Sequence, residues 1–178
     1  MILHLLRHTK TACNDGICYG FADVELANTF TQDLKTVQQK ISGITFSRIY
    51  SSPLKRCAML AQSLNCNGQV IYDDRLKELN FGRWENKSWD EISQTPEAVA
   101  WFDDFINIPC PQGESYSMLR NRAETFLNDV TKRHSLDSAL VVTHGGTIRA
   151  MISLLTDISP KDTFQSKIDY GQLLTFVV

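Results

Sequence analysis

Two short apolar runs, residues 2–6 and 139–143, most constrain the fold of this chain. Each run is almost continuously hydrophobic, which is typical of a strand that is covered on both faces. Longer segments lie between them, and residues 28–42 show the three- and four-residue apolar spacing of a helix. This alternation predicts an α/β fold, a three-layer α/β/α sandwich with a mainly parallel central sheet.

The remaining segments complete this pattern. Further strands are expected at 48–51, at 69–72 and near 173–178. Further helices are expected from Ser52-Pro53 to about 64, at 115–134 and from His144 to about 155. His134 would be a solvated residue at the end of its helix. Residues 73–114 are irregular and contain all three tryptophans, so we expect them to form a helical flap on a single domain spanning 1–178.

Charge and apolar patterning exclude several classes of function. Eighteen basic and twenty acidic residues give a net charge of −2, whereas nucleic acids and anionic membranes select basic surfaces. No apolar run approaches the ~18 residues of a membrane span, and the first residues do not resemble an export signal. The five cysteines have no disulfide-framework spacing, so we expect reduced thiols and a cytoplasmic location.

Two of the four histidines directly follow the strongest predicted strands. His8 comes after the first strand and His144 after the 139–143 strand, while Arg7 and Arg56 lie at or near strand exits. Glycines 145 and 146 allow backbone N–H groups at a helix start to approach an anion. Because ligands of such sheets bind beyond the carboxyl ends of the strands, these groups are expected to meet around one anionic ligand.

Four sequence blocks, in this order, carry a resemblance to a known family. They are Leu-Arg-His-Thr-Lys-Thr at 6–11 followed by Asn14, Ser-Ser-Pro-Leu-Lys-Arg-Cys-Ala at 51–58, Leu-Lys-Glu-Leu-Asn-Phe-Gly-Arg-Trp-Glu at 76–85, and Val-Thr-His-Gly-Gly at 142–146. Together they resemble the histidine phosphatase (phosphoglycerate mutase-like) superfamily. The resemblance extends over essentially the whole chain.

The resemblance implies a role for each matched residue. His8 would attack phosphorus through an unprotonated ring nitrogen, with its other nitrogen donating to a backbone carbonyl. Glu78 would protonate the leaving oxygen and later take a proton from water. The phosphoryl oxygens would be held by Arg7, Arg56, His144, Asn14 and the backbone at Gly145. No metal or other cofactor is expected, because the protein's own cations neutralise the phosphoryl charge.

One position departs from the family pattern. The family usually has glycine after the nucleophile, and this chain has Thr9. Threonine requires an ordinary backbone conformation there, and its hydroxyl could donate to the phosphate.

Substrate contacts are less constrained by the sequence. Tyr19, Phe81 and Trp84 are candidates to face the substrate, whereas Trp101, Phe102 and Phe105 are expected to be packing residues. Residues 113–115 are expected to be a loop and helix cap. Lys10, Arg83 and Arg149 are either surface charges or ligands for a second anionic group.

The chain length favours hydrolysis over mutase chemistry, because a mutase needs further enclosing segments. Residues 15–23 and 78–85 resemble the alpha-ribazole phosphatase branch. The resemblance implies removal of the 5′-phosphate from alpha-ribazole phosphate or its corrinoid-linked form in cobalamin nucleotide-loop assembly. A broad-specificity phosphatase for sugar phosphates or phosphoserine, a phosphoglycerate mutase and a non-catalytic phospho-ligand module stay open, as does a homodimer.

Overall fold

The computed structural model describes residues 1–66, 68–133 and 138–178, including the side chains of these residues except that of residue 133. His134 lies outside the described residues. The strands are β1 (Ile2–Arg7), β2 (Arg48–Ser51), β3 (Val70–Tyr72), β4 (Ser138–Thr143) and β5 (Leu173–Val177). The α-helices are α1 (Phe30–Lys40), α2 (Lys55–Ser63), α3 (Trp89–Ser93), α4 (Pro96–Asp103), α5 (Tyr116–Arg133) and α6 (Gly145–Leu155).

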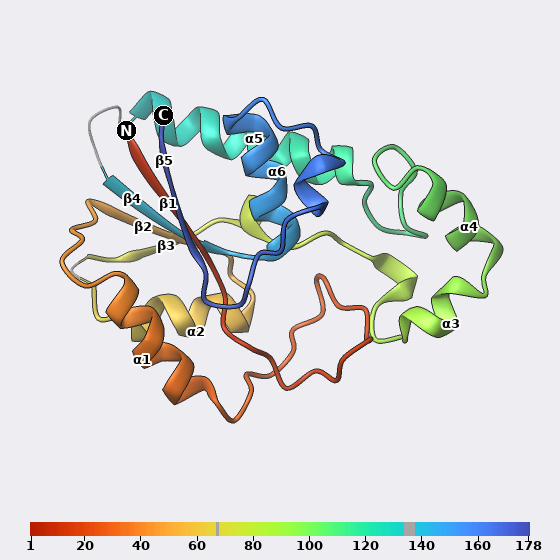
Figure 1. Cartoon of the computed structure of the whole chain (residues 1–178), viewed down its shortest axis with the longest axis horizontal. Coiled ribbons are helices and arrows are strands. Elements are labelled where there is room, and N and C mark those ends of the chain that lie inside the picture. Colours follow the sequence, from red (N-terminus) through yellow and green to blue (C-terminus); the bar gives the residue numbers. More distant parts are fainter. Residues whose placement is uncertain (67, 134–137) are drawn as a thin grey trace.

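The five strands form one sheet in the order β3-β2-β4-β1-β5. The pairs β2–β3, β2–β4 and β1–β4 are parallel, and β5 is antiparallel to β1. The sheet is therefore mainly parallel, as predicted. Helices α1 and α2 cover one face and α5 and α6 cover the other, which confirms the three-layer sandwich (Figure 1).

Alternation along the strands produces two hydrophobic cores. On β4, Ala139 and Val141 belong to the core beneath α5 and α6, while Leu140 and Val142 belong to the core beneath α1 and α2. All four are fully buried, so the strand contributes apolar surface to both layers. Burial on both faces explains why this run is continuously hydrophobic.

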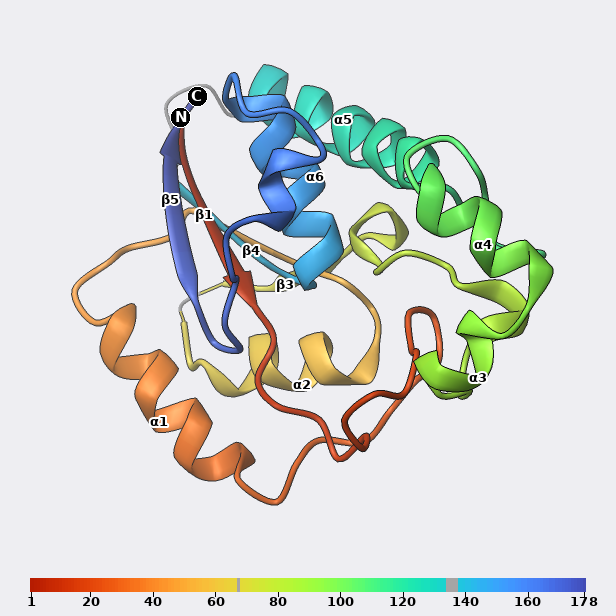
Figure 2. The same ribbon diagram turned by 45° about the vertical axis from the view of Figure 1, so that its right-hand side comes forward.

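The projecting part of the flap lies at one end of the sandwich and contains α3, α4 and the short 3₁₀ helix Gly82–Trp84, whereas a second 3₁₀ helix, Asp74–Leu76, lies against α5 (Figure 2). Local capping starts both α-helices. Ser88 and Glu91 form a capping box at α3, and the hydroxyl of Thr95 accepts from the backbone N–H of Ala98 at α4, where Pro96 is the first helical residue.

One predicted boundary is wrong. Helix α2 begins at Lys55 with Leu54 as its N-cap residue, and not at Ser52-Pro53. The hydroxyl of Ser52 contacts the His144 ring and accepts from the backbone N–H of Leu54, so it is used in a turn before the helix. Arg56 is consequently the second residue of α2.

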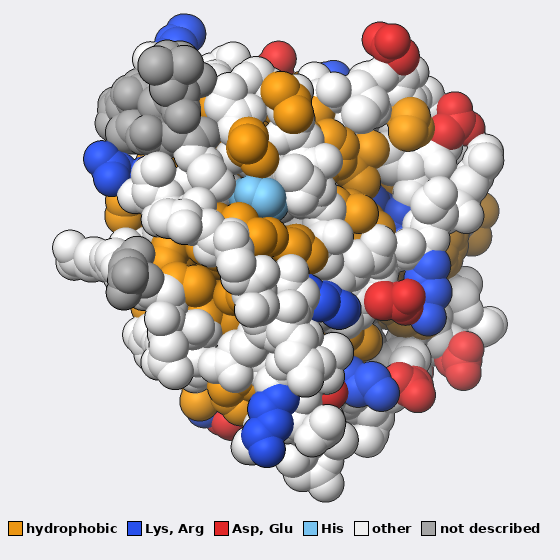
Figure 3. Space-filling view, turned by 60° about the vertical axis from the view of Figure 1, so that its left-hand side comes forward, with side chains coloured by type: hydrophobic (Ala, Val, Ile, Leu, Met, Phe, Trp, Pro, Cys, Tyr) orange, Lys and Arg blue, Asp and Glu red, His pale blue; other side chains and the backbone are white. Residues whose placement is uncertain are grey.

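Charged side chains are intermixed on the face that Figure 3 displays. Basic and acidic groups lie near one another along its lower right margin, and exposed apolar side chains occupy much of its centre. This face therefore carries no broad patch of a single charge.

Candidate active site

His8 lies directly after β1 and is almost completely buried. Its backbone N–H donates to Thr143 at the end of β4, so the exits of the two central strands are adjacent. The ring Nδ1–H donates to the carbonyl oxygen of Thr9 over 2.7 Å, as the sequence predicted, because a carbonyl can only accept. Burial, and then the nearby Arg56 guanidinium, lower the pKa of His8 well below its usual range. The ring is therefore neutral, with the lone pair on Nε2.

His144 follows β4 and is the N-cap residue of α6. Its Nδ1 accepts from Nε of Arg56 over 3.1 Å, which leaves Nε2–H to donate to the Ser52 hydroxyl over 2.8 Å. Burial, followed by the charge of Arg56, lowers the pKa of His144 well below its usual range. The centroids of the His8 and His144 rings are 5.2 Å apart. The second histidine is thus beside the first, but its ring nitrogens are both engaged by protein groups.

Arg56 is fully buried and held from three directions. Its Nη1 and Nη2 donate to the carbonyls of Ala22 and Gly20, and its Nε donates to His144. These bonds use three of the five guanidinium N–H groups, so two remain for a ligand. The loop after β1 and the helix after β2 together fix this cation.

Glu78 approaches the same place from the segment between the 3₁₀ helices Asp74–Leu76 and Gly82–Trp84. Its Oε2 accepts from the backbone N–H of Gly146 over 2.9 Å, and its Oε1 accepts from that of Leu79 over 3.0 Å. A side chain at residue 146 would overlap Oε1, which explains why glycine stands at this position. The first turn of α6 therefore positions the carboxylate.

A partly buried ion pair holds the backbone that carries Glu78. Arg122 of α5 pairs with Glu114 over 3.0 Å and donates to the carbonyls of Arg75, Lys77 and Glu78. The hydroxyl of Ser115 accepts from the N–H of Met118. These contacts agree with the predicted loop and helix cap at 113–115, and they add a function in holding the Glu78 segment.

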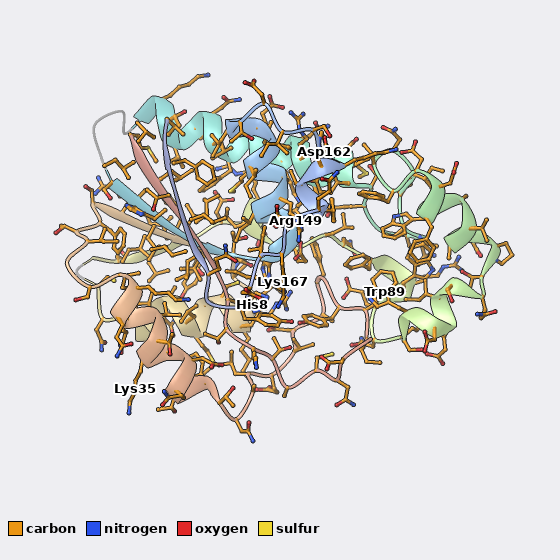
Figure 4. All side chains as sticks on the ribbon, viewed as in Figure 1. His8, Lys35, Trp89, Arg149, Asp162 and Lys167 are labelled. Carbon is orange, nitrogen blue, oxygen red and sulfur yellow. The ribbon has the colours of Figure 1, made fainter. Side chains whose placement is uncertain are left out.

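His8, Arg56 and Glu78 line one cavity of about 360 Å³. Its phosphoryl end, as we name it, is lined by Arg7, His8, Arg56, Glu78, Gly145 and Gly146. Its aromatic wall consists of Tyr19, Phe81, Trp89, Trp101, Phe105, Tyr116, Phe164 and Tyr170. In Figure 4, His8 lies where β1 ends, Arg149 lies on α6, and Trp89 lies across from them on α3.

Three predicted site residues are absent from the described cavity lining. Asn14 is exposed on the loop after β1, and His144 lies behind the lining. Trp84 is only 3% exposed and packs edge-on against Trp101, so the structure corrects its expected position facing the substrate. Tyr19 and Phe81 do line the cavity.

Thr9 has an ordinary backbone conformation, since its φ is not positive. Its hydroxyl is buried and has no hydrogen-bond partner among the described residues. Thr9 lines a separate hollow beside α1, together with Lys10 and Asp33. Its hydroxyl therefore does not lie in the lining of the cavity next to His8.

The three candidate ligands for a second anion are separated by the structure. Lys10 lies outside the cavity, and Arg83 pairs with Glu97 at the surface over 3.6 Å. Arg149 lines the cavity one helical turn after Gly145, donates to the carbonyl of Thr163 and stacks over Phe164 at 4.9 Å. Only Arg149 of these three can therefore reach a ligand in the cavity.

Sequence reasoning missed Tyr170 and the cavity-lining positions of Trp89, Trp101 and Phe105. Tyr170 lies three residues before β5, and β5 runs antiparallel to β1. The start of an antiparallel neighbour lies beside the end of β1, so pairing the first and last strands would have indicated Tyr170.

The described residues provide neither a metal site nor a membrane-spanning helix. Within residues 1–66, 68–133 and 138–178, no cluster of three His, Cys, Asp or Glu side chains could hold a metal ion. Over the same residues, no helix is long and apolar enough to cross a membrane.

Known proteins share this architecture. A family model for the histidine phosphatase superfamily (branch 1) matches residues 3–178. Phosphoserine phosphatase 1 of Hydrogenobacter thermophilus is 32% identical over 161 residues, covering 88% of this chain and 76% of the relative. Adenosylcobalamin/alpha-ribazole phosphatase of Escherichia coli is 24% identical over 176 residues, covering 96% and 87%. The crystal structure of the alpha-ribazole phosphatase from Shigella flexneri has a TM-score of 0.90 at 23% identity, covering 98% of this chain and 89% of that one.

These matches extend over most of the chain, and the relatives described above are phosphatases. The protein is therefore a phosphatase built on an α/β sandwich. More specifically, the chain belongs to the histidine phosphatase superfamily, which confirms the resemblance in the sequence.

Proposed function

We propose that this phosphatase hydrolyses phosphomonoesters through a phosphohistidine at His8. The observation that carries the proposal is the convergence of His8, Arg7, Arg56 and Glu78 on one cavity. In the first step, Nε2 of His8 bonds to phosphorus, the ester P–O bond breaks, and Glu78 gives its proton to the leaving oxygen. In the second step, water attacks phosphorus of the phosphohistidine, Glu78 takes the water's proton, the P–Nε2 bond breaks, and inorganic phosphate leaves.

Arg7, Arg56 and the backbone at Gly145 supply the charge and donors for the phosphoryl oxygens. Arginine suits this task because it stays protonated and donates from a planar fork. His144 holds Arg56 through Nδ1, and its Nε2–H reaches a phosphoryl oxygen only by leaving Ser52. Asn14 remains a proposed ligand that would have to move in from its exposed loop.

For the substrate, we propose alpha-ribazole 5′-phosphate or its corrinoid-linked form. A cavity of about 360 Å³ is within the range used for nucleoside-sized ligands. Its aromatic wall suits a flat benzimidazole, which stacks on or packs edge-to-face against aromatic rings. Two alpha-ribazole phosphatases among the similar proteins support the same choice.

A second candidate substrate is phosphoserine or another small phosphomonoester with a second anionic group. Arg149 supports this alternative, because it lines the cavity and no carboxylate in the described part of the chain forms an ion pair with it. The 32% identical relative is a phosphoserine phosphatase.

A phosphate-release screen decides between these substrates. It compares kcat/KM for alpha-ribazole 5′-phosphate, phosphoserine, sugar phosphates and nucleotides. We expect the kcat/KM of alpha-ribazole phosphate to exceed that of the next substrate by about tenfold or more, because one good aromatic contact contributes about this factor. Trp89→Leu should remove most of that preference, with Tyr72→Leu as the control away from the cavity. A first rank for phosphoserine or a sugar phosphate contradicts the substrate assignment, and bisphosphate-dependent exchange without phosphate release contradicts hydrolysis.

A further inference from the structure

We infer that Tyr170 is a positioning residue that holds the Arg7 guanidinium in place to bind the phosphoryl group. With Tyr19 it forms what we call the tyrosine clamp, which joins two loops beside His8. The inference rests on the proposed role of Arg7 in phosphate binding, and it does not depend on which phosphomonoester is the natural substrate.

The backbone places Tyr170 at the tip of a tight turn. Residue 173 pairs with Leu6, and the N–H of Gln172 donates to the carbonyl of Asp169 over 3.1 Å, which closes the turn. Gly171 has a φ of +64°, a conformation that favours glycine. Its N–H donates to the carbonyl of His8 over 3.1 Å. The turn that presents Tyr170 is thus attached directly to the proposed nucleophile.

The Arg7 guanidinium lies against the Tyr170 ring and close to Gly145. The ring centroid is 3.9 Å from Cζ, and a Cβ at residue 145 would lie 3.4 Å from both Cζ and Nε. Nη1 of Arg7 donates to the carbonyl of Ile168 in the same loop as Tyr170. The guanidinium is therefore held by the Tyr170 ring against its face and by a hydrogen bond to the same loop.

A buried donor of this guanidinium has no partner among the described residues. Nε of Arg7 is buried and makes no hydrogen bond to any residue that the structure describes. A buried donor without a partner is destabilising, so the arrangement favours binding of an acceptor. A phosphoryl dianion has the charge and the oxygen acceptors that match it.

The tyrosine clamp connects both proposed phosphate-binding arginines. The hydroxyls of Tyr170 and Tyr19 are 3.0 Å apart, and the Tyr19 ring lies 5.3 Å from Cζ of Arg56. Thr11 donates to the Tyr19 oxygen over 3.1 Å. Burial raises the pKa of Tyr19 to about 12, so both its proton and its hydrogen bond persist at neutral pH. Each tyrosine covers one guanidinium, and the hydroxyl pair holds the two rings together.

Substitutions at Tyr170 test whether its ring positions Arg7 or only lines the cavity. The dissociation constant for inorganic phosphate is measured by calorimetry, and kcat and KM are measured with p-nitrophenyl phosphate. Tyr170→Leu should weaken phosphate binding by about tenfold, which lies between the values for an exposed and a fully desolvated cation–π contact, and should lower kcat as well. Tyr170→Phe keeps the ring over Arg7 and should stay within about threefold of the wild type. Tyr72→Leu, on the opposite edge strand, is the matched control and should change neither constant.

A double-mutant cycle tests whether Tyr170 acts through Arg7. In an Arg7→Gln background, Tyr170→Leu should change phosphate affinity by less than about twofold, because the cation it positions is gone. A repeated tenfold loss in that background overturns the proposal, as does wild-type affinity in Tyr170→Leu alone or no phosphate binding by the wild type. Thermal midpoints verify folding, and Tyr170→Met replaces the leucine variant if the latter does not fold. Because the probes are phosphate and p-nitrophenyl phosphate, failure of alpha-ribazole phosphate as substrate is a separate result.

Discussion

Gly146→Ala is expected to impair catalysis while leaving the fold intact. An added Cβ would overlap Oε1 of Glu78 and lie 3.1 Å from its Cδ, so the carboxyl group must shift by about 1 Å. Such a displacement of a reacting group costs up to about 100-fold in rate. Gly146 has no positive φ and lies in the first turn of α6, where alanine is at least as good a helix former. We therefore predict a 10- to 100-fold loss of kcat (~1.4–2.7 kcal/mol) with an unchanged or higher thermal midpoint.

The assay compares two leaving groups. An alkyl phosphate needs a proton on its leaving oxygen, whereas p-nitrophenolate leaves without one, so Gly146→Ala should slow the alkyl phosphate more. The Glu78→Gln background provides the control, because the displaced group is then no longer an acid and Gly146→Ala should cost nothing further. Equal losses for both leaving groups, or an additional loss in Glu78→Gln, would refute the reasoning.

Three further predictions concern His8, pH and metals. His8→Ala should abolish turnover but retain part of the affinity for phosphate through Arg7 and Arg56. Steady-state activity within tenfold of the wild type would show that His8 is not the nucleophile. Because the pKa values of His8 and His144 lie well below 6.5, the folded protein binds fewer protons than the unfolded chain near that pH. The free energy of unfolding should therefore be highest above pH 6.5 and fall as the pH drops below it, and urea titrations that show increasing stability from pH 7.5 to 5.5 would contradict this. Activity should survive EDTA, and a loss that Mg²⁺ or Zn²⁺ restores would show that the protein's own cations are not sufficient.

The sandwich was predictable because each strand is a short apolar run that can be recognised from its own residues. Residues 48–51 match β2, and the 139–143 run differs from β4 by one residue. The exits of β1 and β2 then bring His8 and Arg56 to one edge of the sheet, as the rule for parallel sheets predicts. The motif around Glu78 was recognisable in the sequence, but its contact with Gly146 joins residues 68 positions apart and required the fold.

The aromatic wall was less predictable, because tertiary packing decides which face of each flap helix is covered. Trp84 and Trp89 are close in sequence and chemically identical, yet Trp84 is buried away from the cavity and Trp89 lines it. Predicting that Tyr170 lines the cavity required the antiparallel pairing of the last strand with the first, which is a contact between the two ends of the chain. The predicted start of α2 was wrong because the Ser52 hydroxyl accepts a hydrogen bond from His144, which is 92 residues away in the sequence.

The most direct measurement is to trap and locate the phosphoenzyme. Glu78→Gln is mixed with labelled p-nitrophenyl phosphate, whose leaving group needs no acid, so phosphorylation proceeds while hydrolysis of the intermediate is slowed. After an alkaline quench and proteolysis, the label is predicted on the peptide containing His8, with the acid lability of a phosphoramidate. Label on another residue, or no label in an enzyme that still releases p-nitrophenol, would contradict nucleophilic catalysis by His8.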